Sequence, residues 1–437
     1  FDSVDIDKAK DYAAEDADVT YRLYKKFLKD IKEEKLVNIY ESFEKPMIKI
    51  LAKMEISGIR LDKNSLLKLS KKFEKKIAEL EKEIFKISKK KFNIGSTKQL
   101  GEIMYNDLKI STLKKTKKGS FATSAAVLED LAFKGHKFPQ LVLDWRQVSK
   151  LKNTYSDALP EHLNPNTKRV HTSFLLAATT TGRLASSDPN LQNIPIKSED
   201  GKDIRKAFTA KNKDYFIMAA DYSQIELRII ASLSNEENMI NAFKNNEDIH
   251  SSTAAAVFNV PINSVNREQR SNAKVVNFGI IYGVSAFGLS NQTNLSRKES
   301  KELIEKYYQK YPKLKKYISD QISFARDKGY VETILGRRRY LKDINSRNGI
   351  IRGASERNAV NAPIQGSAAD IIKLAMINIQ EVINKSEFKS KMLLQVHDEL
   401  VFDVFKPELN EFMSMVKNQM ENAFEIKVPL TVDVNYG

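Results

Sequence analysis

The sequence contains no cysteine in its 437 residues. Disulfides, thiolate catalysis and cysteine-ligated zinc are therefore excluded, and the absence fits a reducing compartment. No stretch reaches the roughly 18 uninterrupted apolar residues that a membrane-spanning helix needs, so we expect no membrane partner. The P-loop signature G-x-x-x-x-G-K-[ST] is also missing, which leaves any phosphate binding to other motifs.

Positive charge is in excess, because 72 Lys and Arg stand against 56 Asp and Glu and give a formal net charge of +16. Such an excess favours a polyanionic partner, since cationic side chains neutralise phosphates and release their counterions. The alternative is a lysine-rich proteome encoded by an A·T-rich genome. Residues 1–20 are acidic and helical in character and resemble neither a signal nor a transit peptide, so we expect a trimmed fragment.

Hydrophobic periodicity indicates an α+β chain. Apolar residues recur every three or four positions over 63–91, which predicts a long amphipathic helix packed on a second helix. Further helical patterns cover 236–330, 350–385 with an interruption at Pro363, and about 407–424, and strand patterns cover 216–220, 393–404 and 428–434. A basic loop is expected at 113–119, and 164–196 form a long polar connection. The predicted fold is a small antiparallel sheet with helical insertions.

Two acidic residues interrupt apolar strands. Asp221 ends one strand and precedes a helix, and Asp398 lies in "LLQVHDELVFDV" (393–404), at the turn if this stretch is a hairpin. Each has an ordinary alternative, which is a helix cap for Asp221 and a simple turn for Asp398. Together they predict a shared cation site, because carboxylates about 4 Å apart repel by about 4 kcal/mol at an effective dielectric of 20. Without metal, we expect one of them to have a raised pKa.

A helix at 266–283 carries cations and then aromatic rings on one slowly drifting face. Arg270, Lys274, Phe278 and Tyr282 follow one another at four-residue steps. Asn266 with Gln269 predicts a capping box at the start of this helix. Cations suit a triphosphate and rings suit a base or sugar. The alternative is an exposed basic start that runs into a buried aromatic end.

Two polar segments are suited to reading nucleic acid. Arg357, Asn361 and Gln365 repeat every four residues within 356–366, and the alternative for them is an ordinary polar helix face. A second group of polar side chains crowds the loop 179–195, namely Arg183, Asn190, Gln192 and Asn193. Gly182 and Gly366 allow close backbone approach next to these groups.

These motifs together resemble those of the family A DNA polymerases. "DYSQIELR" (221–228), the 266–283 helix and "VHDE" (396–399) are similar to motifs A, B and C of that family, in family order. "TTTGRLASSDPNLQNIP" (179–195) and "ERNAVNAPIQGSAADIIK" (356–373) resemble its primer–template segments. The resemblance covers essentially the whole chain and implies template-directed DNA synthesis from dNTPs on a primer–template, in replication and repair.

The resemblance also implies a right-hand fold with an antiparallel palm sheet and helical fingers and thumb. The implied division is a C-terminal remnant of a 3′–5′ exonuclease-like domain at 1–35, the thumb at 36–160, the palm at 161–232 and 331–437, and the fingers at 233–330. Tyr12 and Asp16 resemble the last exonuclease motif, but no D-x-E metal site occurs in the chain. We therefore expect no proofreading from it.

The roles of individual residues follow from the resemblance. Asp221, Asp398 and the carbonyl of Tyr222 would hold two Mg²⁺ ions, for which Mn²⁺ is a possible substitute, and Glu399 would be an auxiliary acidic group. The implied dNTP-binding residues are Arg270, Lys274, Phe278, Tyr282, Glu226, His250 and Gln224. Lys274 would also give a proton to pyrophosphate, and Glu226 would exclude a ribose 2′-OH. The implied DNA contacts are Arg183, Asn190, Gln192, Asn193, Arg357, Asn361, Gln365 and His397.

Two rival functions share parts of this pattern. A single-subunit RNA polymerase would use the same two aspartates, but Glu226 with Phe278 implies a pocket that excludes ribose. An inactive DNA-binding protein is the other rival, and it is disfavoured because every catalytic position that we can match is filled. The resemblance implies a monomer in the bacterial cytoplasm, with an organelle such as a plastid or apicoplast, or a phage, as alternative sources.

Overall fold

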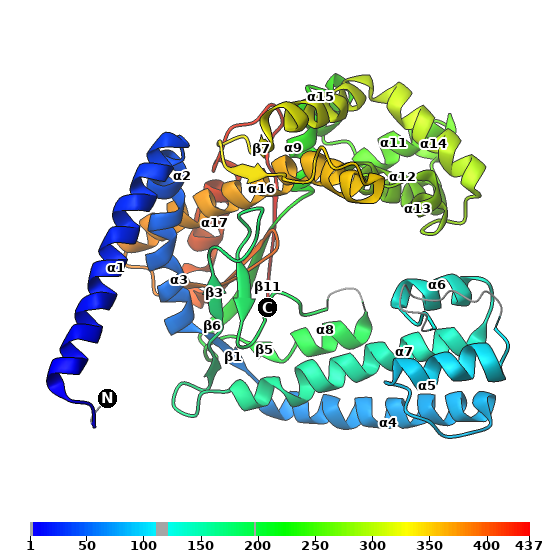
Figure 1. Cartoon of the computed structure of the whole chain (residues 1–437), viewed down its shortest axis with the longest axis horizontal. Helices are drawn as coiled ribbons and strands as arrows, with labels where there is room; N and C mark the ends of the chain where they lie inside the picture. Colours follow the sequence, from blue (N-terminus) through cyan, green and yellow to red (C-terminus); the bar gives the residue numbers. More distant parts are fainter. Residues whose placement is uncertain (1–2, 111–120, 196–197) are drawn as a thin grey trace.

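The computed structural model describes residues 3–110, 121–195 and 198–437. The basic loop predicted at 113–119 lies outside these residues. In Figure 1 the helices α11–α15 lie above and α4–α7 lie below, on the same side of a central β-sheet. Within the described ranges, no helix is both long enough and apolar enough to cross a membrane.

The central sheet has four strands in the order β11-β6-β10-β9, and every neighbouring pair is antiparallel. Its strands are β6 (Tyr215–Tyr222), β9 (Lys391–Val396), β10 (Glu399–Phe405) and β11 (Val432–Tyr436). The apolar run at 393–404 is a hairpin with its turn at His397 and Asp398, as predicted, and His397 has the positive φ of 56° that the turn requires. The predicted antiparallel sheet is thus confirmed.

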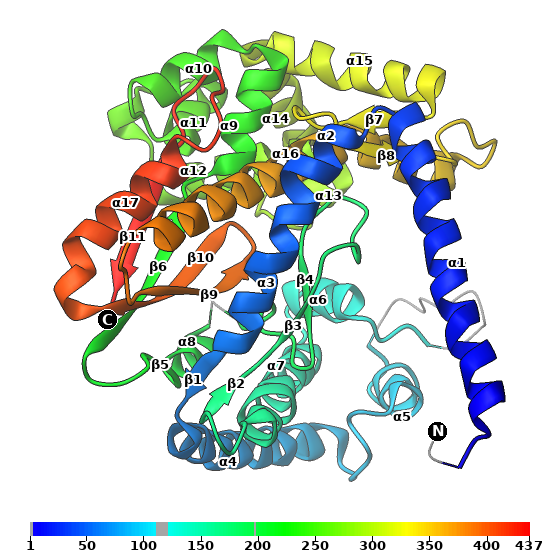
Figure 2. The same cartoon turned by 90° about the vertical axis from the view of Figure 1, so that its left-hand side faces the viewer.

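Helices α3 (Lys45–Ser57), α16 (Gly349–Lys385) and α17 (Leu409–Glu421) pack along this sheet and on each other (Figure 2). The short strands form three smaller antiparallel sheets. They are β1 (Ile59–Leu61), β2 (Arg169–Val170), β3 (Ser173–Leu175), β4 (Ala185–Ser187), β5 (Phe208–Thr209), β7 (Tyr330–Glu332) and β8 (Arg338–Tyr340). Three of these strands lie within the polar segment 164–196, which sequence patterns indicated only as a connection.

A helical insertion follows β6, as the pattern over 236–330 predicted. Its helices are α9 (Ile225–Ser234), α10 (Glu237–Lys244), α11 (Ile249–Phe258), α12 (Arg267–Ile281), α13 (Ala286–Ser290), α14 (Arg297–Lys310) and α15 (Pro312–Lys328). The predicted capping box is present at the start of α12, where the Asn266 side chain accepts from Gln269 N and the Gln269 side chain accepts from Asn266 N.

The long helix predicted at 63–91 is α4 (Lys63–Ser88), and it packs against α7 (Lys137–Leu151) as expected. Together with α5 (Thr97–Glu102) and α6 (Ala125–Phe133), the far ends of α4 and α7 enclose a hydrophobic core of their own. The near end of α4 belongs instead to the main core, which also contains α3 and the central sheet. Helix α8 (Glu199–Arg205) lies beside α4.

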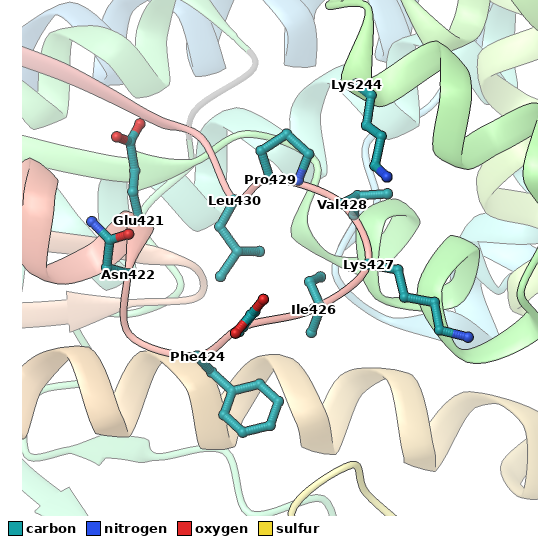
Figure 3. Close-up of a pocket in the computed structure, with 10 residues that line it drawn as sticks. Lys244, Glu421, Asn422, Phe424, Ile426, Lys427, Val428, Pro429 and Leu430 are labelled. Atoms are coloured by element: carbon teal, nitrogen blue, oxygen red, sulfur yellow. The ribbon is translucent and has the colours of Figure 1, made fainter.

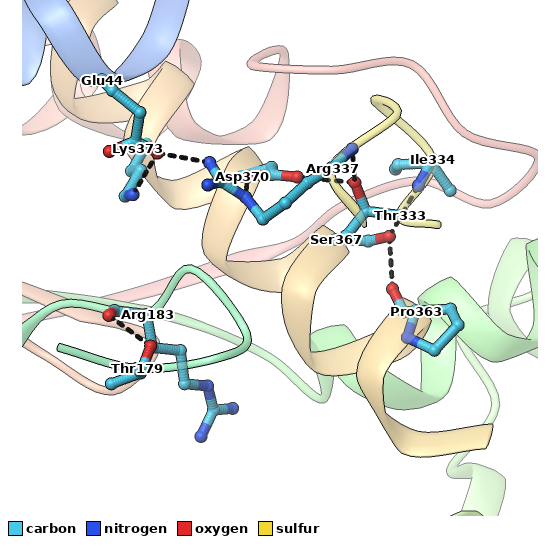
Figure 4. Close-up of polar contacts among 10 residues, drawn as sticks. All are labelled: Glu44, Thr179, Arg183, Thr333, Ile334, Arg337, Pro363, Ser367, Asp370 and Lys373. Atoms are coloured by element: carbon cyan, nitrogen blue, oxygen red, sulfur yellow. Dashed lines mark hydrogen bonds and ion pairs between the residues drawn. The ribbon is translucent and has the colours of Figure 1, made fainter. Parts of the chain in front are cut away.

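The predicted interruption at Pro363 is wrong, because α16 is one continuous helix of 37 residues that contains this proline. An interior proline removes one backbone hydrogen bond and costs about 3 kcal/mol. Packing of α16 against α3, α9, α15 and α17 outweighs that loss. Ser367 Oγ donates to the Pro363 carbonyl at 2.5 Å and accepts from Ile334 N at 2.9 Å (Figure 4). These bonds connect this turn of α16 to the segment that follows β7.

The N-terminal helix α1 (Ile6–Glu33) has no buried residue. Just after it, Glu34 accepts hydrogen bonds from Arg338 and Tyr340, at 2.8 and 2.5 Å. The assignment of 1–35 as an exonuclease remnant and the other domain boundaries stay predictions.

A buried ionic network joins the segment before α3 to α16 (Figure 4). Glu44 accepts from Arg337 and from Lys373, the latter at 2.8 Å, and Arg337 Nε donates to Asp370 at 2.7 Å. Asp370 and Lys373 are at most 1% exposed, and their opposite charges balance. Arg337 also lies against Gly182, where an added Cβ would sit 2.5 Å from its Nε, so the network supports the loop that carries Arg183.

We predict that Glu44→Gln destabilises this region by about 3–5 kcal/mol, because it leaves the buried Lys373 without its carboxylate partner. Hydrogen exchange of the α16 amides under native conditions measures the loss. Glu41→Gln is the matched control, since Glu41 pairs with Lys45 on the surface and its loss leaves these amides unchanged. Equal exchange rates in the two variants would contradict the role of the network.

Candidate active site

The strand register brings the predicted acidic residues together. Asp221 near the end of β6 lies opposite Glu399 of β10 and opposite Asp433 of β11. Asp398 is in the hairpin turn just before Glu399, and its carbonyl accepts from Tyr222 N at 3.1 Å. Two like charges thus stand directly across from Asp221, an arrangement that destabilises a sheet unless something else compensates for it.

The pKa values of the two aspartates reflect this crowding. Asp398 is half-buried, and burial, with smaller effects of Glu226 and Asp221, raises its pKa to about 6 against the lowering by Arg183. Asp221 lies on an exposed part of the sheet, yet the protein around it displaces enough water to raise its pKa to about 6. The expectation of a raised pKa is confirmed, but its main cause is desolvation. The repulsion on Asp221 comes from Glu399 and Asp433 rather than from Asp398.

A divalent cation would fit these carboxylates. Within the described ranges, neither side chain makes a hydrogen bond or an ion pair, and carboxylates desolvated without partners are costly. Hard oxygen donors are the ligands that Mg²⁺ prefers, and it commonly takes only one or two from the protein. No group of three or more acidic or histidine side chains is placed to hold a metal in the part of the chain that the structure describes.

A second polar group lies next to Asp398 and centres on Glu226 of α9. This side chain is 6% exposed. It accepts from Arg183 Nη2 at 2.8 Å and from the Tyr282 hydroxyl at 2.6 Å. Burial and the bond to Glu226 raise the pKa of Tyr282, which also contacts Gln365. Four predicted site residues from four separate segments therefore meet in one cluster.

Helices α11 and α12 lie side by side and hold the predicted phosphate-binding residues (Figure 1). Arg270 pairs with Asp248 at 2.5 Å, and Lys274 is exposed without a partner in the described chain. His250 is 2% exposed, and its ring centre lies 5.8 Å from that of Phe278. Burial, with smaller effects of Lys274 and Arg270, lowers the pKa of His250 to about 4 even though Asp248 opposes the shift.

The predicted DNA-contacting residues outside the Glu226 cluster fall into two places. Gln192 Nε2 donates to Gln395 Oε1 at 3.0 Å, and Gln192, Asn193 and His397 line a cavity of about 460 Å³ together with residues of α7. Burial and nearby arginines lower the pKa of His397. Asn190 instead accepts from Gln192 N within its own turn, at 3.0 Å.

The second place is α16. Arg357 packs against Gly283, where an added Cβ would meet its Cγ at 2.6 Å. Asn361 Oδ1 is buried and has no hydrogen-bond partner among the described residues, so its capacity to accept a hydrogen bond is unused in this structure. Gln224 begins α9 with a φ of 53°, and nothing in its contacts assigns it to a nucleotide.

Sequence patterns missed three charged residues of this site. Asp433 faces Asp221 across the sheet, Arg205 approaches Glu399 at 3.9 Å with a buried unpaired Nε, and Asp248 pairs with Arg270. The strand pattern at 428–434 pointed to Asp433 only as a strand residue. Arg205 and Asp248 lie in segments without a recognisable motif.

A cavity of about 840 Å³ lies away from this site, where the loop 422–430 curls beside α10 (Figure 3). Lys244, Phe424 and Lys427 are among its lining residues, and none of the residues discussed above contributes to it. Arg228 holds the loop by donating to the Pro429 carbonyl at 2.6 Å.

Comparison with known proteins identifies the family of this chain. The model of DNA polymerase family A matches residues 63–437, and the chain belongs to this family. Among its relatives are three bacterial enzymes named DNA polymerase I. The enzyme of Rhizobium leguminosarum is 48% identical to this chain over 99% of its residues. The enzyme of Caldicellulosiruptor bescii is 49% identical over 95% of the chain, and that of Pseudomonas aeruginosa is 43% identical over 100%.

The chain spans 43%, 49% and 48% of these relatives, about half of their length. A solved structure, the POL domain of Pol1 from M. smegmatis in complex with DNA primer-template and dNTP, is 42% identical. The match has a TM-score of 0.89 and covers 94% of this chain and 72% of that one. The family that the motifs suggested is thus confirmed.

We predict that Asp398→Asn raises the thermal stability of the metal-free protein at pH 8. The folded-state pKa of about 6 lies above the unfolded value of 3.8, so the ionised carboxylate destabilises the fold above pH 6 and ceases to do so below pH 4. The gain is about 1–3 kcal/mol at pH 8 and disappears at pH 4. Scanning calorimetry in chelator measures it.

Asp403→Asn on the same strand is the control. Asp403 pairs with Arg169 at 2.6 Å and accepts from Lys211 N, so its neutralisation lowers stability instead. Added Mg²⁺ stabilises the wild type more than Asp398→Asn. A lower stability of Asp398→Asn than of wild type at pH 8 in chelator would refute the account of the site.

Proposed function

We propose that this chain is a template-directed DNA polymerase that adds deoxynucleotides from dNTPs to a primer 3′-hydroxyl and releases pyrophosphate. The observation that carries the proposal is the pair of unpartnered carboxylates, Asp221 and Asp398, next to the Glu226 cluster that leads to α12. Family membership supports it, as does the primer-template and dNTP named for the related Pol1 structure. We assign the palm to 161–232 and 331–437, the fingers to 233–330 and the thumb to 36–160.

Asp221, Asp398 and the Tyr222 carbonyl would hold two Mg²⁺ ions, or Mn²⁺ in their place. When bound, these ions supply activation of the primer hydroxyl and neutralise charge on the triphosphate. Glu399 is 3.9 Å from Arg205 and acts as an auxiliary acid rather than a ligand.

The α12 residues bind the nucleotide in this proposal. Arg270 and Lys274 bind the triphosphate, and Lys274 donates a proton to the departing pyrophosphate. The incoming phosphates compete with Asp248 for Arg270, which is paired with Asp248 in the absence of a ligand. Phe278 packs on the sugar and base, and Glu226 with Tyr282 closes the 2′ side of the sugar pocket.

The polar loop and α16 contact the primer–template. Arg183 and Gln365 reach the nascent pair from the Glu226 cluster, and Asn361 offers its unpaired Oδ1. Gln192, Asn193 and His397 line the cavity that lies between the sheet hairpin and α7, which suits a primer end. We also propose that the protein is a monomeric enzyme of the bacterial cytoplasm that acts in replication and repair; the bacterial organisms of its relatives support the bacterial source.

We predict that Asp398→Asn lowers primer extension at least about 10³-fold, because neutralising a carboxylate weakens cation binding by several kcal/mol. Extension of a labelled primer with dNTPs and Mg²⁺ measures the loss. Binding of the same primer–template remains within a few-fold of wild type, which separates catalysis from DNA affinity. Robust extension by the variant would contradict the assignment of Asp398 as a metal ligand. No extension by the wild type would favour an inactive DNA-binding protein.

We predict that Glu226→Ala increases the use of rNTPs relative to dNTPs by about 10- to 100-fold, because it opens the side of the pocket that a ribose 2′-OH would occupy. Single-nucleotide kcat/KM values for matched dNTP and rNTP pairs measure the ratio. Tyr282→Phe is the control, since it removes the hydrogen bond to Glu226 but keeps the carboxylate in place. The assignment fails if the wild type already uses both sugars equally.

A further inference from the structure

A chain of buried side chains runs behind the phosphate-binding face of α12. Thr253 Oγ1 lies 2.9 Å from the Tyr311 hydroxyl and donates to Asn277 Oδ1 at 3.1 Å. Asn277 Nδ2 lies 2.9 Å from His250 Nδ1. Tyr311, Thr253 and Asn277 are all fully buried, so water does not compete for these bonds.

The hydrogen bonds of Asn277 set the donor at His250. Thr253 Oγ1 donates to Asn277 Oδ1 and can accept from the Tyr311 hydroxyl. The Asn277 amide nitrogen, which only donates, faces His250 Nδ1. A nitrogen that accepts from an amide N–H carries no proton itself. His250 Nδ1 is then the unprotonated nitrogen, and the single proton of a neutral ring lies on Nε2.

His250 has reason to be neutral at pH 7. Arg270 and Lys274 on α12 face it with positive charge, and Asp248 on its own helix is already paired with Arg270. A neutral imidazole binds a phosphate oxygen only through its one N–H. The choice of nitrogen therefore decides whether His250 attracts or repels a triphosphate.

We propose that Asn277 is a positioning residue that holds His250 in the neutral tautomer with its proton on Nε2, so that Nε2–H is presented to the triphosphate. The proposal rests on the proposed function for the identity of the ligand but not for the tautomer. Nε2 makes no hydrogen bond among the described residues, which leaves it for a ligand. Asn277 directly precedes Phe278 on α12. The same helix turn would therefore position both the His250 Nε2–H that donates to the phosphate and the Phe278 ring that packs on the sugar.

Nitrogen NMR on histidine-labelled protein tests the tautomer without any enzyme assay. The chain has only five histidines, and His250→Gln assigns the signal. We expect a pyridine-like Nδ1 and a pyrrole-like Nε2 from pH 6 to 9, and a shift of the Nε2–H signal on addition of inorganic triphosphate. A protonated Nδ1 in the wild type at pH 7 would overturn the proposal.

Asn277→Asp tests the function of the tautomer. The new carboxylate accepts a hydrogen bond from Nδ1–H and so keeps the proton on Nδ1, and the ring is doubly protonated at low pH and loses the Nε2 proton as pH rises. The KM for dNTP should therefore rise by about tenfold with pH in this variant, the loss of one hydrogen bond to a charged group. In the wild type, His250 adds no pH dependence to KM over the same range.

Asn272→Asp is the matched control, because Asn272 is another buried amide of α12 and makes no hydrogen bond to His250 within the described chain. It should leave the pH dependence of KM flat. An equally flat profile in Asn277→Asp, with an unchanged His250 signal, would also overturn the proposal.

If Asn277→Asp does not fold, Thr253→Val removes the donor to Oδ1 and should allow partial protonation of Nδ1. A wild type without DNA synthesis would remove the proposed function, and the NMR result would still decide the tautomer.

Discussion

The central constraint on this molecule is negative charge gathered at a desolvated strand end, where Asp221 and Asp398 have no ion-pair partner among the described residues and Glu399 has only Arg205, at 3.9 Å. Pairing of β6 with β10 and β11 sets Glu399 and Asp433 across from Asp221, and the hairpin turn adds Asp398. The apolar strands on either side hold these groups in place, because moving them apart would break the register of a buried sheet. In the proposed function, this arrangement would be preorganised for a cation, at some cost to the stability of the metal-free fold.

Glu226 connects the acidic strand end to the polar loop and to α12. It joins Arg183 from the polar loop and Tyr282 from the end of α12, and its charge reaches Asp398. Arg183 in turn follows Gly182, whose backbone rests on Arg337 of the buried ionic network. Segments far apart in the sequence are thus positioned by two sets of polar contacts that meet where Gly182 packs on Arg337.

Local patterns were enough to predict the features that depend on neighbouring residues. The hairpin at 393–404, the capping box of Asn266 and Gln269, and the amphipathic helix beginning at residue 63 all follow from short-range spacing. Continuity of α16 through Pro363 was not predictable, because tertiary packing overrides a strong local signal. Asp433 opposite Asp221 was not predictable either, since strand pairing between distant segments leaves no local trace. The motifs pointed to candidate residues that the structure brings together, such as Arg183, Glu226 and Tyr282, but not to buried neighbours such as Asn277, which contacts His250.

Helix α4 connects two hydrophobic cores. Leu66 and Phe73 belong to the main core and Ile84 to the core shared with α5, α6 and α7, while Leu80 touches both. A helix of 26 residues is about 39 Å long, so a tilt of about 5° at its base displaces its far end by roughly 3 Å. The second core would therefore be displaced together with the far end of α4 whenever the packing of the base of this helix in the main core changed.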